Sequence, residues 1–319
     1  MQMIDMHCDT VWGLTEKEKA GISESLTENT LAVDVKGMRK AGSMAQFFAC
    51  FIYMKMFEGE KRWEEGFQYA KRMLKRLKKE IMQSTDMEFA YRTEDVRKNF
   101  AGGKISAVMT IEEGGILDNR IERLDEFYKE GVRLVTLLWN EENCIGYPNS
   151  KDVTLMQKGL KPFGIECIRK MNELGMLIDV SHMSDGGFWD VVRYSSKPFV
   201  ASHSNARAIC AHPRNLSDKM LKAIGESGSV AGMNLYPYFV NKEGVSTYEA
   251  LARHVLHMVD KAGIEGVAIG TDLDGFDEGE TPIMKIGDMT EFYRYLQKKG
   301  MRESDLRKIW YENALRVLL

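Results

Sequence analysis

Short apolar runs alternate with amphipathic stretches along nearly the whole chain. The runs are rich in Val, Ile, Leu, Met, Phe and Ala, and they lie at about 2–7, 44–53, 104–111, 132–138, 176–181, 198–202, 228–235 and 266–271. Most of the stretches between them are long enough for a crossover helix, so the pattern predicts parallel strands joined by right-handed β–α–β connections. Roughly eight such units in a chain of this length fit an α/β fold of the (β/α)8 type, the TIM barrel.

A doubly wound parallel sheet is the alternative architecture. It is disfavoured because no glycine-rich dinucleotide-binding fingerprint follows the first expected strand. The chain also contains no Gly/Ser-rich or Pro-rich linker and no low-complexity tract. We therefore expect residues 1–319 to form a single domain.

The clearest helical pattern lies at 60–82. Its apolar positions recur in alternating steps of four and three residues: Trp63, Phe67, Ala70, Leu74, Leu77 and Ile81. Lysines and arginines fill many of the other positions, but Glu64, Glu65 and Glu80 dilute their charge. We expect this helix to lie outside the barrel with a solvated face, and not to bind nucleic acid.

Composition and charge argue against several classes of partner. The net charge of -3 gives no general attraction to nucleic acid. No basic segment followed by an apolar one opens the chain, and no run reaches the ~18 apolar residues of a membrane span. The five cysteines are scattered without a Cys-x-x-Cys pair, which is typical of reduced thiols. We expect a cytoplasmic protein without a membrane or nucleic-acid partner.

Three of the six histidines, His7, His182 and His203, close short apolar runs. The carboxylates Glu113 and Asp272 end two similar runs. Because the C-terminal ends of parallel strands meet at one rim, we expect these side chains to lie close together. Imidazoles and carboxylates in such a cluster are typical ligands of a catalytic metal, zinc before all, with manganese, iron or cobalt as alternatives.

The acidic residues near these strand ends allow more than one interpretation. His7 and Asp9 are two residues apart and point the same way on a strand, which suits one metal ion, although Asp9 could instead cap a following helix. Glu113 could bridge two metal ions or cap a helix. Asp272 and Asp274 share a face if the strand continues, so either could carry a proton in catalysis, or both could belong to a turn.

Taken together, these motifs resemble the renal (membrane) dipeptidase family of zinc metallopeptidases, in the amidohydrolase superfamily. The matching pieces follow the family's order from end to end of the chain: DMHCD at 5–9, EGG at 113–115, IDVSH at 178–182, SHSNAR at 202–207, RN at 214–215, GTDLDG at 270–275 and ENALRV at 312–317. Each piece is short, but the ordered set is specific.

The resemblance implies a (β/α)8 barrel with a binuclear zinc site, that is, two zinc ions per chain. By this resemblance His7 and Asp9 hold one zinc ion, His182 and His203 hold the other, and Glu113 bridges the two. The implied activity is hydrolysis of small dipeptides, including those with a C-terminal D-residue, by a hydroxide that bridges the zinc ions. The alternative is an amidohydrolase acting on another amide, such as an N-acyl amino acid, or on a lactam or lactone. A homodimer is a candidate assembly.

The resemblance also implies roles around the metal site. Asp272 matches the family's catalytic acid/base, with Asp274 as the competing choice. Arg214 matches the arginine that pairs with the substrate's terminal carboxylate, and Tyr236 lines the same pocket or packs in the core. The chain departs from the pattern at Trp139, where some family members have a histidine associated with the substrate carbonyl. We expect Trp139 to change substrate preference and rate, or to be a buried core residue.

Overall fold

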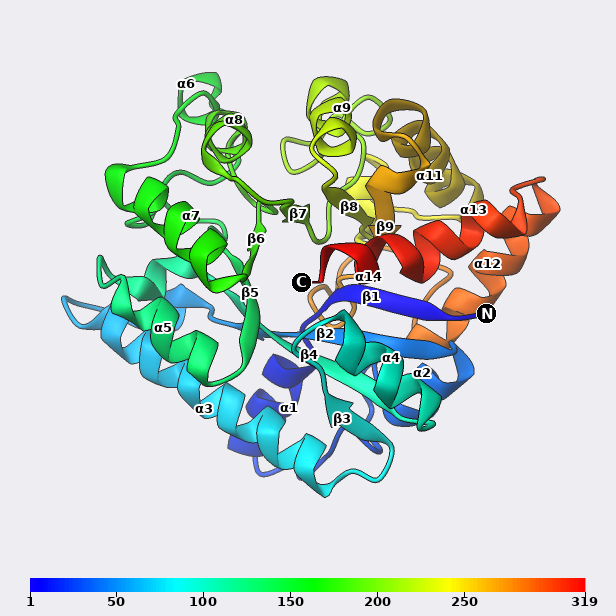
Figure 1. The fold of residues 1–319 in the computed structure, drawn as a ribbon, viewed down its shortest axis with the longest axis horizontal. Coiled ribbons are helices and arrows are strands. Elements are labelled where there is room, and N and C mark those ends of the chain that lie inside the picture. Colours follow the sequence, from blue (N-terminus) through cyan, green and yellow to red (C-terminus); the bar gives the residue numbers. More distant parts are fainter. Residues whose placement is uncertain (319) are drawn as a thin grey trace.

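Eight parallel strands close into a barrel with helices around it (Figure 1). The computed structural model describes residues 1–318. The barrel strands are β1 (Met3–Cys8), β2 (Ser43–Phe51), β4 (Ile105–Glu112), β5 (Val132–Thr136), β6 (Leu177–Asp179), β7 (Val200–Ala201), β8 (Val230–Met233) and β9 (Val267–Ile269). Each of the eight apolar runs in the sequence contains or overlaps one of these strands. The prediction of a (β/α)8 barrel is confirmed.

The order of the strands shows how the barrel closes. They follow one another as β2-β1-β9-β8-β7-β6-β5-β4, and β2 pairs in parallel with β4 from Ala45↔Ser106 to Phe51↔Glu112. A further short strand, β3 (Met87–Phe89), pairs with the first residues of β4 and was not anticipated from the sequence. With three residues and alternating exposure, it lacks the continuous apolar run that marks the barrel strands.

Helices follow most of the strands. Their bounds are α1 (Thr10–Lys19), α2 (Val35–Lys40), α3 (Arg62–Gln83), α4 (Thr93–Ala101), α5 (Glu122–Lys129), α6 (Val153–Met156), α7 (Pro162–Leu174), α8 (Asp185–Tyr194), α9 (Asp218–Glu226), α10 (Pro237–Val240), α11 (Tyr248–Ala262), α12 (Met289–Lys298), α13 (Glu303–Arg307) and α14 (Asn313–Val317). Turns of 3-10 helix lie at η1 (Met54–Met56), η2 (Gly114–Leu117), η3 (Ile264–Gly266) and η4 (Ile286–Asp288), and a π-helical turn lies at η5 (Lys308–Glu312). Within residues 1–318, no helix is both long and apolar enough to cross a membrane.

The long helix α3 agrees with the pattern at 60–82. Its apolar stripe faces inward, with Phe67, Leu74 and Leu77 at most 4% exposed, while the basic residues of the opposite face lie at the surface or partly so. The stripe packs into the main hydrophobic core, which fills the space between the barrel and its helices. This burial explains why a strongly charged helix is stable on the outside of the barrel.

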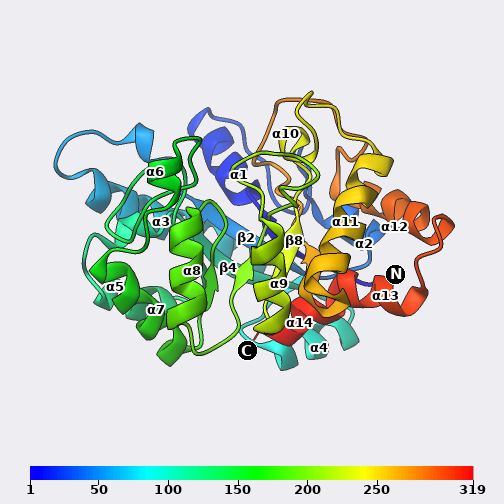
Figure 2. The ribbon, with the colours of Figure 1, turned by 90° about the horizontal axis from the view of Figure 1, so that it is seen from above.

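A second, smaller core lies inside the barrel. Each of the eight barrel strands contributes to it, and α14 adds Ala314, Leu315 and Val317. In Figure 1 the C-terminal helix α14 lies across the middle of the barrel. Figure 2 shows α14 on one side of the sheet, and on the other side α1 and α10, which directly follow β1 and β8. Apolar residues of α14 close one end of the barrel, so polar groups can gather at the other end, where the strands have their C-terminal ends.

Candidate metal centre and active site

The C-terminal strand ends bring most of the expected site residues to one place. His7 lies in β1 and Glu112 ends β4, while His182, His203 and Asp272 follow β6, β7 and β9. His182 and Asp272 have positive φ angles of 68° and 61°, so the backbone turns sharply as each of these two residues leaves its strand. All three histidines are buried, with 1 to 9% exposed. The structure thus brings His7, His182, His203 and Asp272 together at one rim, together with Glu112, which the sequence analysis did not single out.

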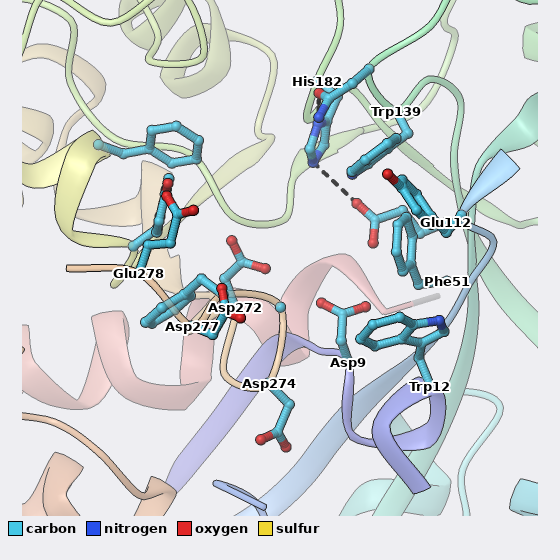
Figure 3. Close-up of a pocket in the computed structure, with 16 residues that line it drawn as sticks. Asp9, Trp12, Phe51, Glu112, Trp139, His182, Asp272, Asp274, Asp277 and Glu278 are labelled. Atoms are coloured by element: carbon cyan, nitrogen blue, oxygen red, sulfur yellow. Dashed lines mark hydrogen bonds and ion pairs between the residues drawn. The ribbon is translucent and has the colours of Figure 1, made fainter. Parts of the chain in front are cut away.

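Glu112 is the carboxylate that lies between the histidines. Its Oε2 is 3.2 Å from His7 Nε2, and its Oε1 is 3.1 Å from His182 Nε2 and 3.6 Å from His203 Nε2. Two groups of potential metal ligands therefore share Glu112, and one of its oxygens faces each group. The first group consists of His7, Asp9 and Glu112, and the second consists of Glu112, His182 and His203. Figure 3 shows Glu112 connected to His182 at the edge of the cavity.

Glu113, the residue expected to bridge two metal ions, turns away from the histidines. Its backbone has a φ of 106°, and its Oε1 accepts hydrogen bonds from the Gly115 N–H and from Asn143 Nδ2, both at 2.7 Å. A Cβ atom at position 115 would lie 2.6 Å from this oxygen, so only glycine leaves room for the contact. The structure departs from the expectation for Glu113: Glu112, and not Glu113, lies between the histidines, and Glu113 supports the loop that follows β4.

The alternation of β4 is a signal that could have identified Glu112. Ile105, Ala107, Met109 and Ile111 face the outer core. Ser106, Thr110 and Glu112 occupy the opposite parity, which places Glu112 on the face that looks into the barrel. Glu113 lies one residue beyond the strand, so strand parity does not apply to it.

Hydrogen bonds at Nδ1 determine which nitrogen His182 and His203 present to the centre. His182 Nδ1 is 3.0 Å from Asn140 Oδ1, which can only accept, so this nitrogen carries the proton. His203 Nδ1 is 2.7 Å from Ser202 Oγ, which itself donates to Asp179 and therefore accepts from the histidine. Both Nε2 atoms are then unprotonated, and they lie only 3.0 Å apart. Two lone pairs this close repel each other unless a cation lies between them, so the donor set fits a metal ion.

His7 and Asp9 have unsatisfied polar atoms as well. Neither ring nitrogen of His7 has a hydrogen-bond partner among residues 1–318, and the same is true of Asp9 Oδ1. His7 Nε2 is 3.3 Å from Asp9 Oδ2. In a tetrahedral zinc site with bonds of about 2.0–2.1 Å, neighbouring ligand atoms are about 3.3 Å apart. The buried donors are thus spaced as the ligands of a metal ion are.

Burial and charge shift the pKa values of these groups. Burial opposes ionisation of Glu112, but His7 and His182 outweigh it and hold its pKa below the ordinary range. Burial likewise favours neutral His7, yet the charges of Glu112 and Asp9 raise its pKa well above normal. Burial lowers the pKa of His182 to about 4, with Arg214 adding to the effect, and it holds the pKa of His203 well below the ordinary value. The last two rings are therefore neutral at neutral pH, as metal ligands must be.

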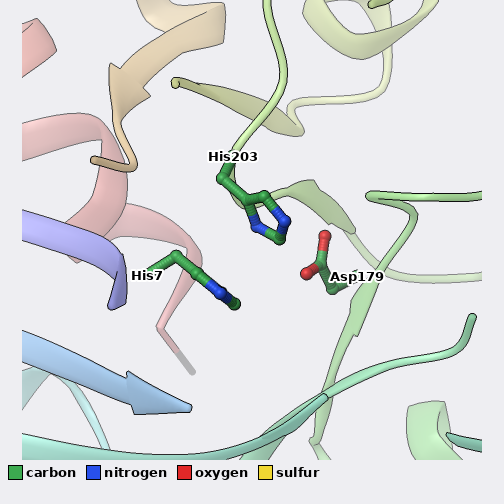
Figure 4. Close-up of side chains that lie close together, drawn as sticks. All are labelled: His7, Asp179 and His203. Carbon is green, nitrogen blue, oxygen red and sulfur yellow. The ribbon is translucent and has the colours of Figure 1, made fainter. Parts of the chain in front are cut away.

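Asp179 supports the centre from behind. It lies near His7 and His203 (Figure 4), but its oxygens accept hydrogen bonds from Thr136 Oγ1 and from the backbone and hydroxyl of Ser202. These bonds make it a support for His203 and not an open ligand. Sequence reasoning did not single out Asp179, Ser202 or Asn140. The available signal was that Asp179 ends β6 three residues before His182, and that Ser202 lies between the end of β7 and His203.

The two aspartates after β9 have different environments. Asp272 Oδ1 is 3.8 Å from His7 Nε2, and its Oδ2 accepts a hydrogen bond of 2.8 Å from Asn234. Burial raises its pKa to about 6. Asp274 also borders the cavity, but its oxygens accept from Thr10 Oγ1 at 2.6 Å and from the Ala32 N–H at 2.7 Å. Asp272 thus lies beside the histidine cluster, whereas Asp274 connects the loop after β9 to Thr10 of α1 and to Ala32.

Arg214 is a buried cation with free hydrogen-bonding capacity. It is 5% exposed, and Nη1 donates to Ser204 Oγ at 2.8 Å. Its Nε and Nη2 have no partner among the described residues. Burial lowers its pKa to about 10, which still leaves it charged at neutral pH. An unsatisfied buried guanidinium is costly, so this geometry favours an anionic ligand.

The centre opens into a cavity of about 580 Å³. Its walls include Trp139 and Tyr236, together with Asp9, Glu112, His182 and Asp272. Figure 3 shows Trp139, Phe51 and Trp12 on one side of this cavity and Asp277 and Glu278 on the other. A volume of this size is typical of a small-molecule site.

The fold and this cluster define a hydrolase of the metal-dependent barrel type. A family model described as "Membrane dipeptidase (Peptidase family M19)" matches residues 1–319, so the chain belongs to this family. With the clusters of potential ligands at its rim, the protein is a metal-dependent dipeptidase of family M19. The resemblance seen in the sequence motifs is confirmed.

Individual relatives agree with this assignment. The chain is 28% identical to the uncharacterized dipeptidase C965.12 of Schizosaccharomyces pombe over 99% of its own length and 79% of the relative's. It is similar to the crystal structure of dipeptidase AC, a family M19 metallopeptidase, with a TM-score of 0.90, 25% identity and coverage of 100% and 98% of the two chains. The fold also matches a metallopeptidase of Rhodobacter sphaeroides bound to a phosphinate mimic of the dipeptide L-Ala-D-Ala, with a TM-score of 0.88, 24% identity and coverage of 100% and 98%.

Proposed function

We propose that this protein hydrolyses small dipeptides at a centre of two zinc ions. The observation that carries the proposal is the position of Glu112, whose two oxygens face two separate groups of buried nitrogen and oxygen atoms. His7 and Asp9 would hold one ion, His182 and His203 the other, and Glu112 would bridge them. Zinc ions bound there would supply a nucleophile from water at neutral pH and would polarise the scissile carbonyl.

Asp272 is suited to carry the proton. It borders the cavity beside His7, and Asn234 holds its side chain in place. A pKa of about 6 lets a carboxylate both accept and donate a proton near neutral pH. In our proposal Asp272 accepts the proton of the attacking water and delivers it to the departing amine. Asp274 is the weaker candidate because both of its oxygens are occupied.

Arg214 is suited to bind the free carboxylate of the leaving residue. Its Nε and Nη2 are buried and unpaired, and a guanidinium offers two parallel donors to a carboxylate. A carboxylate held there, next to the attacked bond, restricts the substrate to two residues. Because the Rhodobacter sphaeroides neighbour was solved with a mimic of L-Ala-D-Ala, we include a D-residue at the C-terminal position among the proposed substrates.

The experiment combines metal content with hydrolysis of L-Ala-L-Ala and L-Ala-D-Ala, each with and without a chelator. We expect two zinc ions per chain and chelator-sensitive cleavage. Asp272→Asn should keep the metal and lower kcat by at least about 100-fold, the usual scale for losing an acid/base, and Asp274→Asn should lower it much less. Two metal ions without dipeptide cleavage would redirect the search to N-acyl amino acids, lactams and lactones. No metal after zinc addition would refute the two-zinc site.

A further inference from the structure

The cavity has two separate groups of aromatic side chains. The first, which we call the aromatic wall, consists of Trp12, Phe51, Tyr53 and Trp139. The second, which we call the tyrosine cluster, consists of Tyr236, Phe239 and Phe276. Rings within each group are in contact, because their centroids are 4.6 to 6.3 Å apart. The catalytic carboxylates and His182 lie in the same cavity as both groups.

The aromatic wall is assembled from three distant parts of the chain. Trp12 comes from α1, Phe51 and Tyr53 from the end of β2 and the loop after it, and Trp139 from the loop after β5. Trp139 is at its centre, with ring centroids 5.0 Å from Phe51, 5.5 Å from Tyr53 and 6.2 Å from the ring of His182. The wall therefore lies beside His182, a candidate metal ligand.

The wall presents apolar surface to the cavity. Trp12, Tyr53 and Trp139 are only partly buried, although Phe51 is 9% exposed. Apolar surface of this kind gains stability when a ligand removes it from water. Aromatic rings in contact edge to face, such as Trp139 and Tyr53 at 89°, also pack well against a further ring. The wall contains no charged group, in contrast to Asp277 and Glu278 across the cavity (Figure 3).

The position of Arg214 decides which end of a dipeptide meets each group. Its guanidinium carbon is 5.5 Å from the ring of Phe239, a member of the tyrosine cluster. Asp277 and Glu278 directly follow Phe276, a member of this cluster, in the chain and line the same cavity. A residue whose carboxylate is bound by Arg214 therefore has its side chain on the side of the tyrosine cluster. The other residue, which carries the attacked carbonyl, extends across the carboxylates toward the aromatic wall.

We propose that the aromatic wall binds the side chain of the amino-terminal residue, and that the enzyme prefers dipeptides whose first residue is large and apolar, above all aromatic. This inference rests on the proposed dipeptidase function and deepens it by naming the substrate class. It makes Trp139 and Tyr53 specificity-determining residues. The side chain of the second residue has no contact with the wall.

The first test compares kcat/KM for two series of dipeptides with zinc-loaded enzyme. In the first series, Gly-Ala, Ala-Ala, Leu-Ala and Phe-Ala vary the amino-terminal residue, and in the second series Ala-Gly, Ala-Leu and Ala-Phe vary the other. We expect Phe-Ala to exceed Gly-Ala by at least about tenfold, equivalent to about 1.4 kcal/mol. Trp139→Ala and Tyr53→Ala should each reduce this ratio several-fold and leave the ratios of the second series unchanged.

Trp189→Ala is the matched control. Trp189 lies on α8, outside the cavity lining, and is 40% exposed, so removing its ring should leave the substrate ratios at their wild-type values. Two wall variants are used because Trp139→Ala removes a partly buried ring, whereas Tyr53 lies in a loop. If only one of them folds, the other still gives the comparison.

Binding is measured separately from turnover. Isothermal titration of Phe-Ala and Gly-Ala into zinc-loaded Asp272→Asn should show tighter binding of Phe-Ala, and Trp139→Ala in that background should remove the difference. Cleavage with equal rates in the first series would overturn the proposal but not the dipeptidase function. A preference that appears only in the second series would also overturn it. If no dipeptide is cleaved and Phe-Ala and Gly-Ala bind alike or not at all, both proposals fail.

Discussion

Two adjacent glutamates differ in their relation to the histidine cluster, and isosteric substitutions separate their roles. Glu112→Gln and Glu113→Gln each replace one carboxylate oxygen by an amide nitrogen of nearly the same size. Glu112 faces His7 and His182, whereas Glu113 faces Gly115 and Asn143. The prediction is that only Glu112→Gln impairs metal binding.

The magnitude for Glu112→Gln follows from the two short distances. Because its oxygens lie 3.2 Å from His7 Nε2 and 3.1 Å from His182 Nε2, an amide group must turn its NH2 toward one of the two ligand groups. A metal ion held by that ligand group would then face an N–H donor in place of an oxygen lone pair. Losing a residue that merely orients a ligand costs 10- to 100-fold in affinity. We therefore expect one of the two zinc ions to be lost, with an affinity lowered more than about 100-fold, or about 2.8 kcal/mol.

Glu113→Gln should leave metal content unchanged. Both of its hydrogen bonds are accepted by Oε1, and Oε2 has no partner among the described residues, so an amide oxygen can keep both bonds. Burial raises the pKa of Glu113 from its ordinary value of 4.5 to about 7. The stabilising contribution of neutral Glu113 to the free energy of unfolding is therefore fully present below about pH 4.5. As the pH rises through about 7, this contribution is lost, and the free energy of unfolding falls by about 3 kcal/mol. Relative to wild type, the variant should gain stability over this pH interval.

The assay measures bound zinc by plasma mass spectrometry after gel filtration, together with dipeptide cleavage and urea unfolding of chelator-treated protein at pH 5 and pH 8. Loss of zinc in Glu113→Gln with retention in Glu112→Gln would refute the geometric reasoning and restore Glu113 as the bridge. Equal loss of zinc in both variants would mean that metal binding depends on the conformation of the whole loop after β4, and not on Glu112 alone. If the free energies of unfolding of Glu113→Gln and wild type differ by the same amount at pH 5 and at pH 8, the raised pKa of buried Glu113 is contradicted.

Other predictions concern residues around the centre. Arg207 donates to the carbonyls on either side of Arg214, so Arg207→Met should raise KM for dipeptides about tenfold with little change in kcat; an unchanged KM would show that the loop holds Arg214 without it. Asn140→Leu removes the acceptor of His182 Nδ1 and should weaken zinc binding about 10- to 100-fold in chelator competition; equal affinity would show that this bond does not orient the ring. Glu278 lines the cavity and faces the second residue in the proposed binding mode, so dipeptides ending in Lys should be cleaved faster than those ending in Glu, and Glu278→Gln or about 1 M salt should reduce the difference.

Much of the fold was determined by the sequence alone. Local patterns define the apolar runs and the long amphipathic helix, and each depends only on neighbours along the chain. The same is true of the convergence of His7, His182 and His203, because parallel strands of a barrel must end at the same rim. Family membership was also visible in short motifs whose order is preserved along the chain.

Only the tertiary structure decided which residues at that rim face the histidine cluster and which hold the surrounding loops in place. The choice between Glu112 and Glu113 depends on where β4 ends and on the turn at φ 106°, a shift of one residue that reverses the side-chain direction. The difference between Asp272 and Asp274 depends on Thr10 and Ala32, which are more than two hundred residues away in sequence. The aromatic wall likewise joins three separate segments. Sequence patterns report local periodicity, whereas these contacts exist only when strands and loops distant in the chain are brought together.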